Sequence, residues 1–192
     1  GIRGLVRSRG LGDVYKRQTQ FTANLEYQGQ SGALNEHFSD VFGTTITQRF
    51  EGQSAGEADW LIGNEIMGPR LYGETLRSMK APGTAYDNTL MGTDPQPGHM
   101  KDYYDGPADN QGVHINSGIP NRAFYLTAME LGTDKAMLIW YQALQNLWAT
   151  AKFNDAYAVI VDSARLLTKT GQVRPGSTQI VRAAFQSVGL PS

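Results

Sequence analysis

The strongest constraint on the fold is a series of segments in the C-terminal part of the sequence whose apolar residues recur at helical spacing. The segments are residues 123–131, 134–148, 154–170 and 177–188. Apolar residues three and four positions apart line one face of an α-helix, and that face must be buried against other helices. Thr133 is expected to cap the second helix and Gly171 to close the third. The pattern predicts a mainly α fold, an orthogonal helical bundle with long irregular loops on one side, and its expected core includes Trp140, Tyr141 and Trp148.

Composition narrows the class of protein. The chain is 40% hydrophobic and 18% charged, which is enough apolar sequence for an ordinary core. Its net charge of -1 gives no electrostatic reason to expect nucleic acid or an anionic membrane as a partner. Cysteine is absent, which excludes disulfides and thiolate metal sites. No apolar run approaches the roughly 20 residues that span a bilayer.

The first 18 residues differ from the rest of the chain. They read GIRGLVRSRGLGDVYKRQ and hold five of the 17 basic residues against one acid. No apolar stretch of signal-peptide length follows these charges. We interpret residues 1–18 as a foreign or artefactual segment, and residues 19–192 as the folded domain. A nucleic-acid-binding or membrane-binding arm is the alternative interpretation of the basic segment.

Residues 31–42 predict a helix with two acids on one face. Leu34, Phe38 and Val41 form its apolar stripe, and Ser31 is expected to be its N-cap. Glu36 and Asp40 are four residues apart, so they share another face of the helix. Such a pair is either a solvated acidic face or a metal ligand with its supporting acid.

Residues 109–118 are dense in small and polar side chains and contain one of only three histidines. A helical pattern begins just after them, at about Asn116, and Asp109 lies five residues before His114. The stretch is either a capped loop with an ordinary histidine or a site in which a carboxylate holds a functional imidazole. His99, in a Pro-Gly loop, is interpreted as a surface histidine.

Several stretches together resemble the thermolysin-like zinc metallopeptidases. They are residues 24–28 (NLEYQ), 31–43 (SGALNEHFSDVFG), 76–79 (LRSM) and 109–121 (DNQGVHINSGIPN). The last of these is the most specific, although Gln111 stands where the family more often has glycine. The resemblance extends over residues 19–190. It implies the mostly helical C-terminal domain of a zinc metalloendopeptidase, a hydrolase that cleaves peptide bonds.

The resemblance also implies roles for individual residues. Glu36 would be a zinc ligand, and Asp40 would orient a histidine ligand from the second coordination shell. His114 and Tyr27 would donate hydrogen bonds to the transition-state oxyanion, and Asp109 would hold the His114 imidazole. Thermolysin itself is the general example of a His₂Glu zinc site, so this ligand set is taken over from the family.

Substrate contacts follow from the same resemblance. Arg77 would bind a substrate carbonyl, and its alternative is a structural arginine paired with an acid. Asn116, Ile62 and Leu76 would also belong to the substrate-binding site, the latter two at an apolar pocket for the residue after the cut. The expected partner is a peptide or protein substrate.

Calcium binding is where the sequence departs from the family. Some members bind two adjacent calcium ions through several acids. Thr47, Leu61 and Asn64 stand at three of those positions, and only Asp59 remains. Calcium needs about six to eight oxygen ligands, so the double calcium site is expected to be absent.

The family's remaining zinc ligands are the two histidines of an H-E-x-x-H motif, whose glutamate is the general base. The chain contains no such motif. The family pattern would place it directly before residue 19, where the unusual segment lies. We therefore expect the C-terminal part of an enzyme truncated after its histidine helix. Such a fragment needs the missing N-terminal domain to complete its site and is inactive alone.

Two other classes of function stay open from the residues. One is a non-catalytic helical binding module derived from the same family. The other is a sugar- or peptide-binding domain whose groove would be formed by Tyr86, Tyr103 and Tyr104. A bacterial, secreted or extracellular location is implied by the resemblance alone.

Overall fold

The computed structural model describes residues 22–191, and these residues form a mainly helical fold, as predicted. The segment 1–18 lies outside this range. The helices are α2 (Gly29–Glu51), α3 (Ala108–Asn116), α4 (Gly118–Leu131), α5 (Thr133–Leu144), α6 (Phe153–Lys169) and α7 (Ser177–Ser187). None of the helices in residues 22–191 combines the length and apolarity needed to cross a bilayer.

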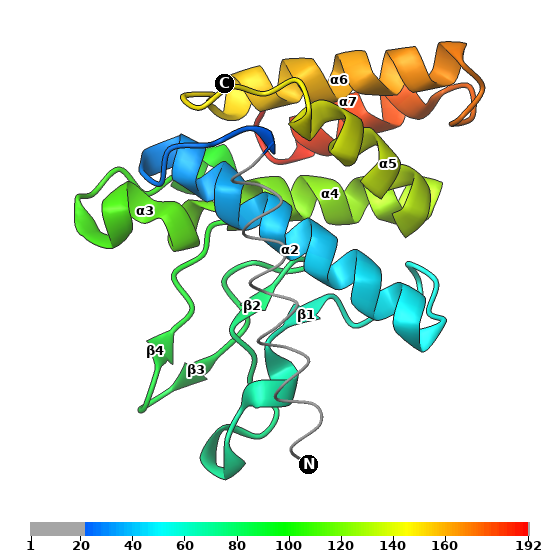
Figure 1. Cartoon of the computed structure of the whole chain (residues 1–192). Coiled ribbons are helices and arrows are strands. Elements are labelled where there is room, and N and C mark those ends of the chain that lie inside the picture. The colour runs from blue at the N-terminus through cyan, green and yellow to red at the C-terminus, as the bar shows by residue number, and fades with distance from the viewer. Residues whose placement is uncertain (1–21, 192) are drawn as a thin grey trace.

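Helix α2 is the central element of the fold. Figure 1 shows it crossing between the helical bundle α4–α7 on one side and the short strands on the other. It contacts α3, α4, α5, α6 and β1, so residues on most of its circumference are buried, including polar ones. The expected N-cap is wrong: α2 begins at Gly29 after Gln28. The Ser31 hydroxyl instead donates to the carbonyl of Ala151, which ties α2 to the loop before α6.

Helices α4 to α7 bury one aromatic cluster. The Trp140 ring meets Phe124 edge-on at 5.2 Å between centroids and stacks on Phe185 at 5.9 Å. Trp140 is fully buried, as predicted, but Trp148 is 48% exposed and Tyr141 is 37% exposed. The prediction for these two was wrong because α5 ends at Leu144, so Trp148 lies in the following loop and Tyr141 at the edge of the bundle.

The predicted cap of α5 is also shifted. Gly132, with φ 83°, is the capping residue, and Thr133 is the first helical residue. The Thr133 hydroxyl donates across the bundle to the side-chain carbonyl of Gln48 on α2. At the end of α6, Gly171 adopts φ 72° just beyond the last helical residue, which agrees with its expected role as a helix stop.

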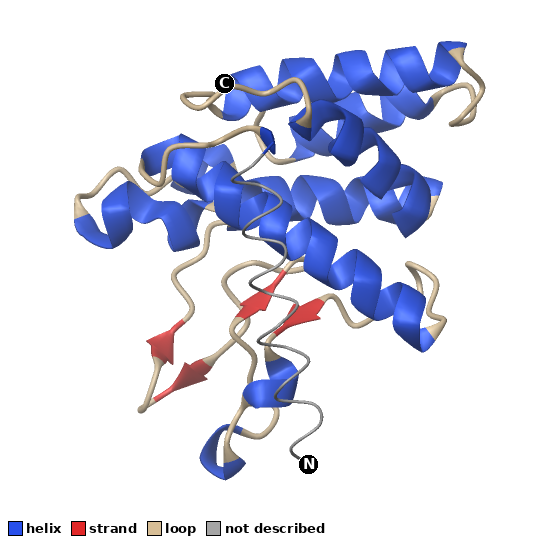
Figure 2. Ribbon diagram, viewed as in Figure 1, coloured by secondary structure: helices blue, strands red, loops and turns tan. Residues whose placement is uncertain are grey.

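The segment between α2 and α3 is irregular, as predicted, and carries short strands and 3-10 turns (Figure 2). Two antiparallel pairs are formed by β1 (Leu61–Ile62) with β2 (Arg77–Ser78), and by β3 (Asp87–Asn88) with β4 (Gly92–Thr93). The 3-10 turns are η1 (Asn64–Ile66), η2 (Pro69–Leu71) and η3 (Met100–Asp102). Trp60, 2% exposed, anchors this segment to the core, where its ring meets Phe124 edge-on.

Candidate active site

Glu36 and Asp40 lie one turn apart on α2, and both are buried, each with 4% of its surface exposed. They therefore do not form a solvated acidic face. A buried carboxylate is costly unless it is hydrogen-bonded or paired, so the groups around each one define what it can do.

The carboxylate of Glu36 is bound by the hydroxyl of Tyr27. Tyr27 precedes α2, and its hydroxyl donates to Glu36 Oε1 at 2.5 Å. The same hydroxyl oxygen lies 3.0 Å from His114 Nε2, and Nε2 is 3.7 Å from Glu36 Oε1. When the single Tyr27 hydroxyl hydrogen is on Glu36, the Tyr27 oxygen is an acceptor toward His114 Nε2, and whether Nε2 carries a hydrogen depends on the tautomer of the ring. Burial, and then the hydrogen bond and charge of Glu36, raise the pKa of Tyr27 above its usual value, so it remains a donor at neutral pH.

His114 is held from its other side by Asp109. Asp109 Oδ1 lies 2.5 Å from His114 Nδ1, and Oδ2 accepts the backbone N–H groups of His114 and Ile115. Four consecutive residues, 109–112, have left-handed backbone angles, with φ between 49° and 81°. This left-handed turn folds the Asp109 side chain back over the start of the following helical turn. The His114 ring is 48% exposed, so it is fixed in direction and open to solvent.

Asp40 is paired with Arg77 of β2. Arg77 Nε donates to Asp40 Oδ2 at 2.8 Å and Nη2 donates to Oδ1 at 2.6 Å. Burial opposes the charged guanidinium, but Asp40 and the nearby Glu36 and Tyr27 raise the pKa of Arg77 above its usual value. Arg77 is thus a charged, oriented fork beside Glu36. Its pairing with an acid is observed, and a role toward substrate remains a proposal.

The remaining candidate residues differ in accessibility. Leu76 is 38% exposed next to Arg77, and Ile62 is partly buried on the facing strand. Asn116 is fully buried, with Nδ2 donating to the carbonyl of Tyr104 and Oδ1 accepting its N–H. A direct contact between Asn116 and a substrate does not fit this position, and its observed role is to anchor the loop before α3.

Asp59, the remaining acid of the family's calcium region, is already satisfied by protein groups. Its Oδ1 accepts the backbone N–H of Leu61, and its Oδ2 accepts the side-chain amide of Asn64. Asn64 thus supplies a donor to Asp59, where an acid would supply a further oxygen ligand for a cation.

The residues that could hold a metal ion are incomplete in this chain. Within residues 22–191, no three histidine, cysteine, aspartate or glutamate side chains are placed to hold one ion. Glu36 can provide one carboxylate ligand. His114 and Tyr27 lie next to Glu36 and do not complete a ligand set with it.

One part of the arrangement was missed from the sequence. His37, next to Glu36, is fully buried and bonded to Asn121 on α4 and Trp140 on α5. A histidine inside an otherwise helical NEHFSD stretch was the available signal. Its partners are 84 and 103 residues away in sequence, so no local pattern could identify them. His99 is partly buried and accepts the N–H of Lys101, which makes it a structural residue rather than a purely surface one.

Known proteins are similar to this chain in sequence and in fold. The family described as thermolysin metallopeptidase, alpha-helical domain, matches residues 23–190. An extracellular metalloprotease of Pectobacterium carotovorum subsp. carotovorum is 55% identical over 129 residues, which are 66% of this chain and 37% of that protein. An extracellular elastase of Staphylococcus epidermidis is 40% identical over 173 residues, 90% of this chain and 30% of the elastase.

A solved structure is also similar. The precursor of protealysin, a metalloproteinase from Serratia proteamaculans, matches with a TM-score of 0.83 and 46% sequence identity, over 90% of this chain and 53% of that one. The chain spans about a third of the length of the curated relatives it matches, 37% and 30% for the two above.

Proposed function

Because the chain belongs to the thermolysin metallopeptidase family over its α-helical domain, we propose that it supplies one wall of a zinc metalloendopeptidase active site. The family consists of zinc metalloendopeptidases, and its members from Pectobacterium and Staphylococcus named above are extracellular proteases. The observation that carries the proposal is the Glu36–Tyr27–His114–Asp109 cluster, in which each polar group is hydrogen-bonded to the next.

Glu36 is the zinc ligand in this proposal. A carboxylate oxygen is an accepted zinc ligand, and the Glu36 carboxylate is buried and accepts a hydrogen bond from the Tyr27 hydroxyl. A bound zinc ion would supply Lewis-acid polarisation of the scissile carbonyl and a water of lowered pKa. The other zinc ligands and the general base belong to the H-E-x-x-H helix that this chain lacks.

His114 and Tyr27 are the proposed oxyanion donors. His114 presents Nε2 and Tyr27 its hydroxyl, and the two lie 3.0 Å apart next to Glu36. Because Asp109 accepts the hydrogen on Nδ1, His114 donates from Nε2 when its ring is the doubly protonated imidazolium. A donor of this kind typically contributes about 10²–10³ in rate. Asp109 holds the imidazole with Nδ1 protonated and so fixes the direction of Nε2.

Arg77 is the proposed contact for a substrate carbonyl, and Leu76 and Ile62 line the apolar pocket for the residue after the cut. Asp40 keeps the guanidinium in place and would orient a histidine ligand. Asn116 contributes indirectly, by anchoring the Tyr104 loop.

The domain boundary and location are part of the same proposal. Residues 19–192 form the peptidase domain fragment, residues 1–18 do not belong to it, and the intact enzyme acts outside a bacterial cell on peptides or proteins. The double calcium site is absent from the proposed enzyme.

A chimera tests the proposal. Residues 22–192 are joined to the N-terminal half of protealysin, including its H-E-x-x-H helix. The expected product binds about one zinc ion and cleaves peptides that have an apolar residue after the cut. Glu36→Gln should lose zinc, whereas His114→Ala should keep zinc and lose about 10²–10³ in kcat.

His99→Gln is the matched histidine control, since His99 lies outside the cluster, and it should change neither property. Zinc retained by Glu36→Gln, or full activity in His114→Ala, would contradict the proposal. A folded, zinc-binding chimera without hydrolysis would favour the non-catalytic binding module.

A further inference from the structure

A second set of buried polar side chains lies behind the candidate site and extends into the core. Trp140 Nε1 is 2.7 Å from His37 Nε2, and His37 Nδ1 is 2.7 Å from Asn121 Oδ1. Asn121 Nδ2 is 2.9 Å from Asp40 Oδ2, and Asp40 holds Arg77. None of Trp140, His37 and Asn121 exposes more than 1% of its surface.

The donor and the acceptor of each hydrogen bond in this series, from Trp140 to Arg77, are fixed. An indole N–H can only donate, so His37 Nε2 accepts and Nδ1 carries the hydrogen. Nδ1–H then donates to the Asn121 oxygen, and the Asn121 amide nitrogen faces Asp40. Asp40 is a carboxylate that also accepts twice from Arg77. Starting from the Trp140 N–H or from the Asp40 carboxylate gives the same donors and acceptors.

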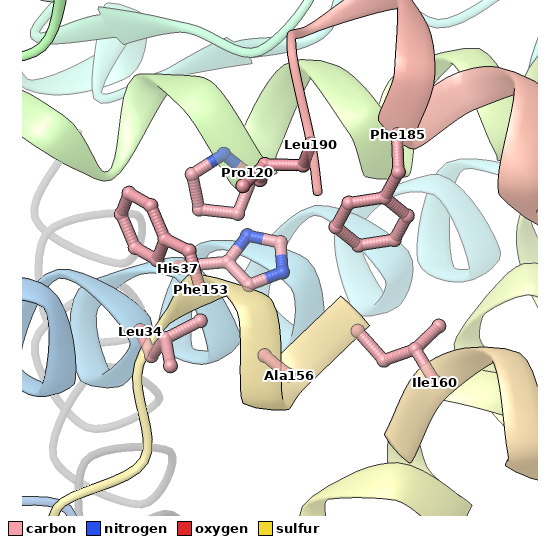
Figure 3. A pocket seen from close by; sticks show the side chains of 8 residues that line it. All are labelled: Leu34, His37, Pro120, Phe153, Ala156, Ile160, Phe185 and Leu190. Carbon is pink, nitrogen blue, oxygen red and sulfur yellow. The ribbon is translucent and has the colours of Figure 1, made fainter. Parts of the chain in front are cut away.

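The surroundings explain why these bonds matter. Figure 3 shows the His37 imidazole among apolar side chains, including Leu34, Pro120, Phe153 and Leu190. In such a place a lost partner cannot be replaced by bulk water. The terminal torsion angles of Asp, Asn and His are broad and two-fold, so packing alone does not select one orientation.

The orientation of each of these side chains is set by its hydrogen-bond partner in the series. Asn121 bridges His37 and Asp40, which are three residues apart on the same face of α2. Its bond to Oδ2 fixes the rotation of the Asp40 carboxylate, and that carboxylate aligns the Nε and Nη2 edge of Arg77. Helices α2, α4 and α5 thereby define the direction of a side chain on β2.

We propose that His37, Asn121 and Trp140 are positioning residues that fix the orientation of the Asp40–Arg77 pair at the candidate site. The role of that pair toward substrate and ligand histidine rests on the proposed function. The alignment of the Asp40–Arg77 pair does not depend on the proposed function.

Nitrogen-15 NMR of the full chain tests the inference without zinc or substrate. In the wild type, Arg77 Nε–H should exchange slowly with water, and His37 should show a single Nδ1–H tautomer. His37→Leu removes both ring nitrogens and should speed exchange of Arg77 Nε–H by about tenfold or more. His37→Gln should restore slow exchange, because its amide can donate to Asn121 and accept from Trp140.

Thr127→Val is the control for a purely structural effect. Thr127 is buried on α4 and bonds only to the Ala123 carbonyl of its own helix. It should destabilise the fold while Arg77 exchange stays near the wild-type rate. If His37→Leu does not fold, Trp140→Phe takes its place; it removes the donor to His37 Nε2 in a site that bulk water does not reach, and it should produce faster Arg77 exchange.

Wild-type Arg77 exchange in a folded His37→Leu or Trp140→Phe variant would overturn the inference, as would equal acceleration in Thr127→Val. A chimera that shows slow Arg77 exchange but no hydrolysis would contradict the proposed function alone.

Discussion

Gln111 occupies the third of four consecutive left-handed positions, with φ 64° and ψ 41°. A left-handed conformation destabilises the fold by roughly 1–2 kcal/mol when the residue has a side chain. Glycine avoids this strain, but its greater conformational entropy in the unfolded chain offsets about 0.5–1 kcal/mol of the gain. Gln111→Gly should therefore stabilise the chain by about 0.5–1 kcal/mol, measured by urea denaturation. Gln179→Gly, on the exposed face of helix α7, is the control and should destabilise it by up to about 1 kcal/mol. Destabilisation by both changes would show that the left-handed turn is not strained at Gln111.

His37 makes the stability of the fold sensitive to acid. Burial lowers its pKa from 6.5 to about 4, against the opposing effects of Asn121 and Asp40. The unfolded chain therefore takes up a proton between pH 6.5 and 4 that the folded chain does not. The full contribution is present above pH 6.5, falls as the pH decreases, and about 3 kcal/mol is lost by pH 4.

Urea denaturation of the wild type and of His37→Gln at pH 7, 6, 5 and 4 measures this loss. The carboxylates titrate in both proteins, so the difference between the two curves isolates His37. Parallel curves would mean that the pKa of His37 is the same in the folded and unfolded chains.

At the residue scale, the sequence identified the four residues of the candidate site but not the buried side chains that hold them in place. Tyr27, Glu36, Asp109 and His114 lie in local motifs, and the structure brings them together. Asn116 was expected at the substrate, yet it is fully buried on the Tyr104 main chain. A motif marks the importance of a residue without distinguishing a contact with a ligand from a contact with the backbone.

At the scale of elements, the close approach of α2 and α3 depends on one glycine. A Cβ on Gly32 would lie 2.4 Å from Val113 Cγ1 and 3.0 Å from the main chain at Tyr27. Gly32→Ala should therefore cost about 1–3 kcal/mol through overpacking. It should also displace His114 from Tyr27, because Val113 and Tyr27 flank the crossing.

Gly43→Ala is the matched control on the same helix, since a Cβ there meets nothing within 4 Å. It should stabilise the fold by about 0.5–1 kcal/mol. Thermal denaturation of both variants, with the His114 ring resonances followed by NMR, measures the two effects. If both substitutions changed the melting temperature in the same direction, the crossing would be looser than the structure indicates.

Helix type was predictable and helix ends were not. Apolar spacing located α4 to α7 because an amphipathic face is written in local sequence. The ends depend on neighbours in space: Ser31 bonds to Ala151, and Thr133 bonds to Gln48. Both hydroxyls were expected at helix caps and are used between helices instead. The error at Trp148 also concerns a helix end, because α5 ends at Leu144 and Trp148 lies in the loop that follows.

At the scale of the whole molecule, the described residues include one proposed zinc ligand, Glu36, and the groups proposed to surround the ion. A single carboxylate does not hold zinc tightly, and the Glu36 oxygen is already bonded to Tyr27. Ligand binding stabilises a fold by RT ln(1 + [L]/Kd), so weak binding produces little change. Zinc at about 0.1 mM should therefore shift the melting temperature of the full chain by less than about 1 °C, and EDTA should have no further effect.

The chimera described above provides the contrast, because EDTA should lower its melting temperature by several degrees through loss of zinc. Glu36→Gln should abolish that difference in the chimera and leave the melting temperature of the isolated chain insensitive to zinc. Calcium should have little effect on either protein, since Asn64 already satisfies Asp59. Stoichiometric zinc on the isolated chain, together with cleavage of a peptide, would mean that ligands outside residues 22–191 complete the site, and the interpretation of residues 1–18 as foreign would then be wrong.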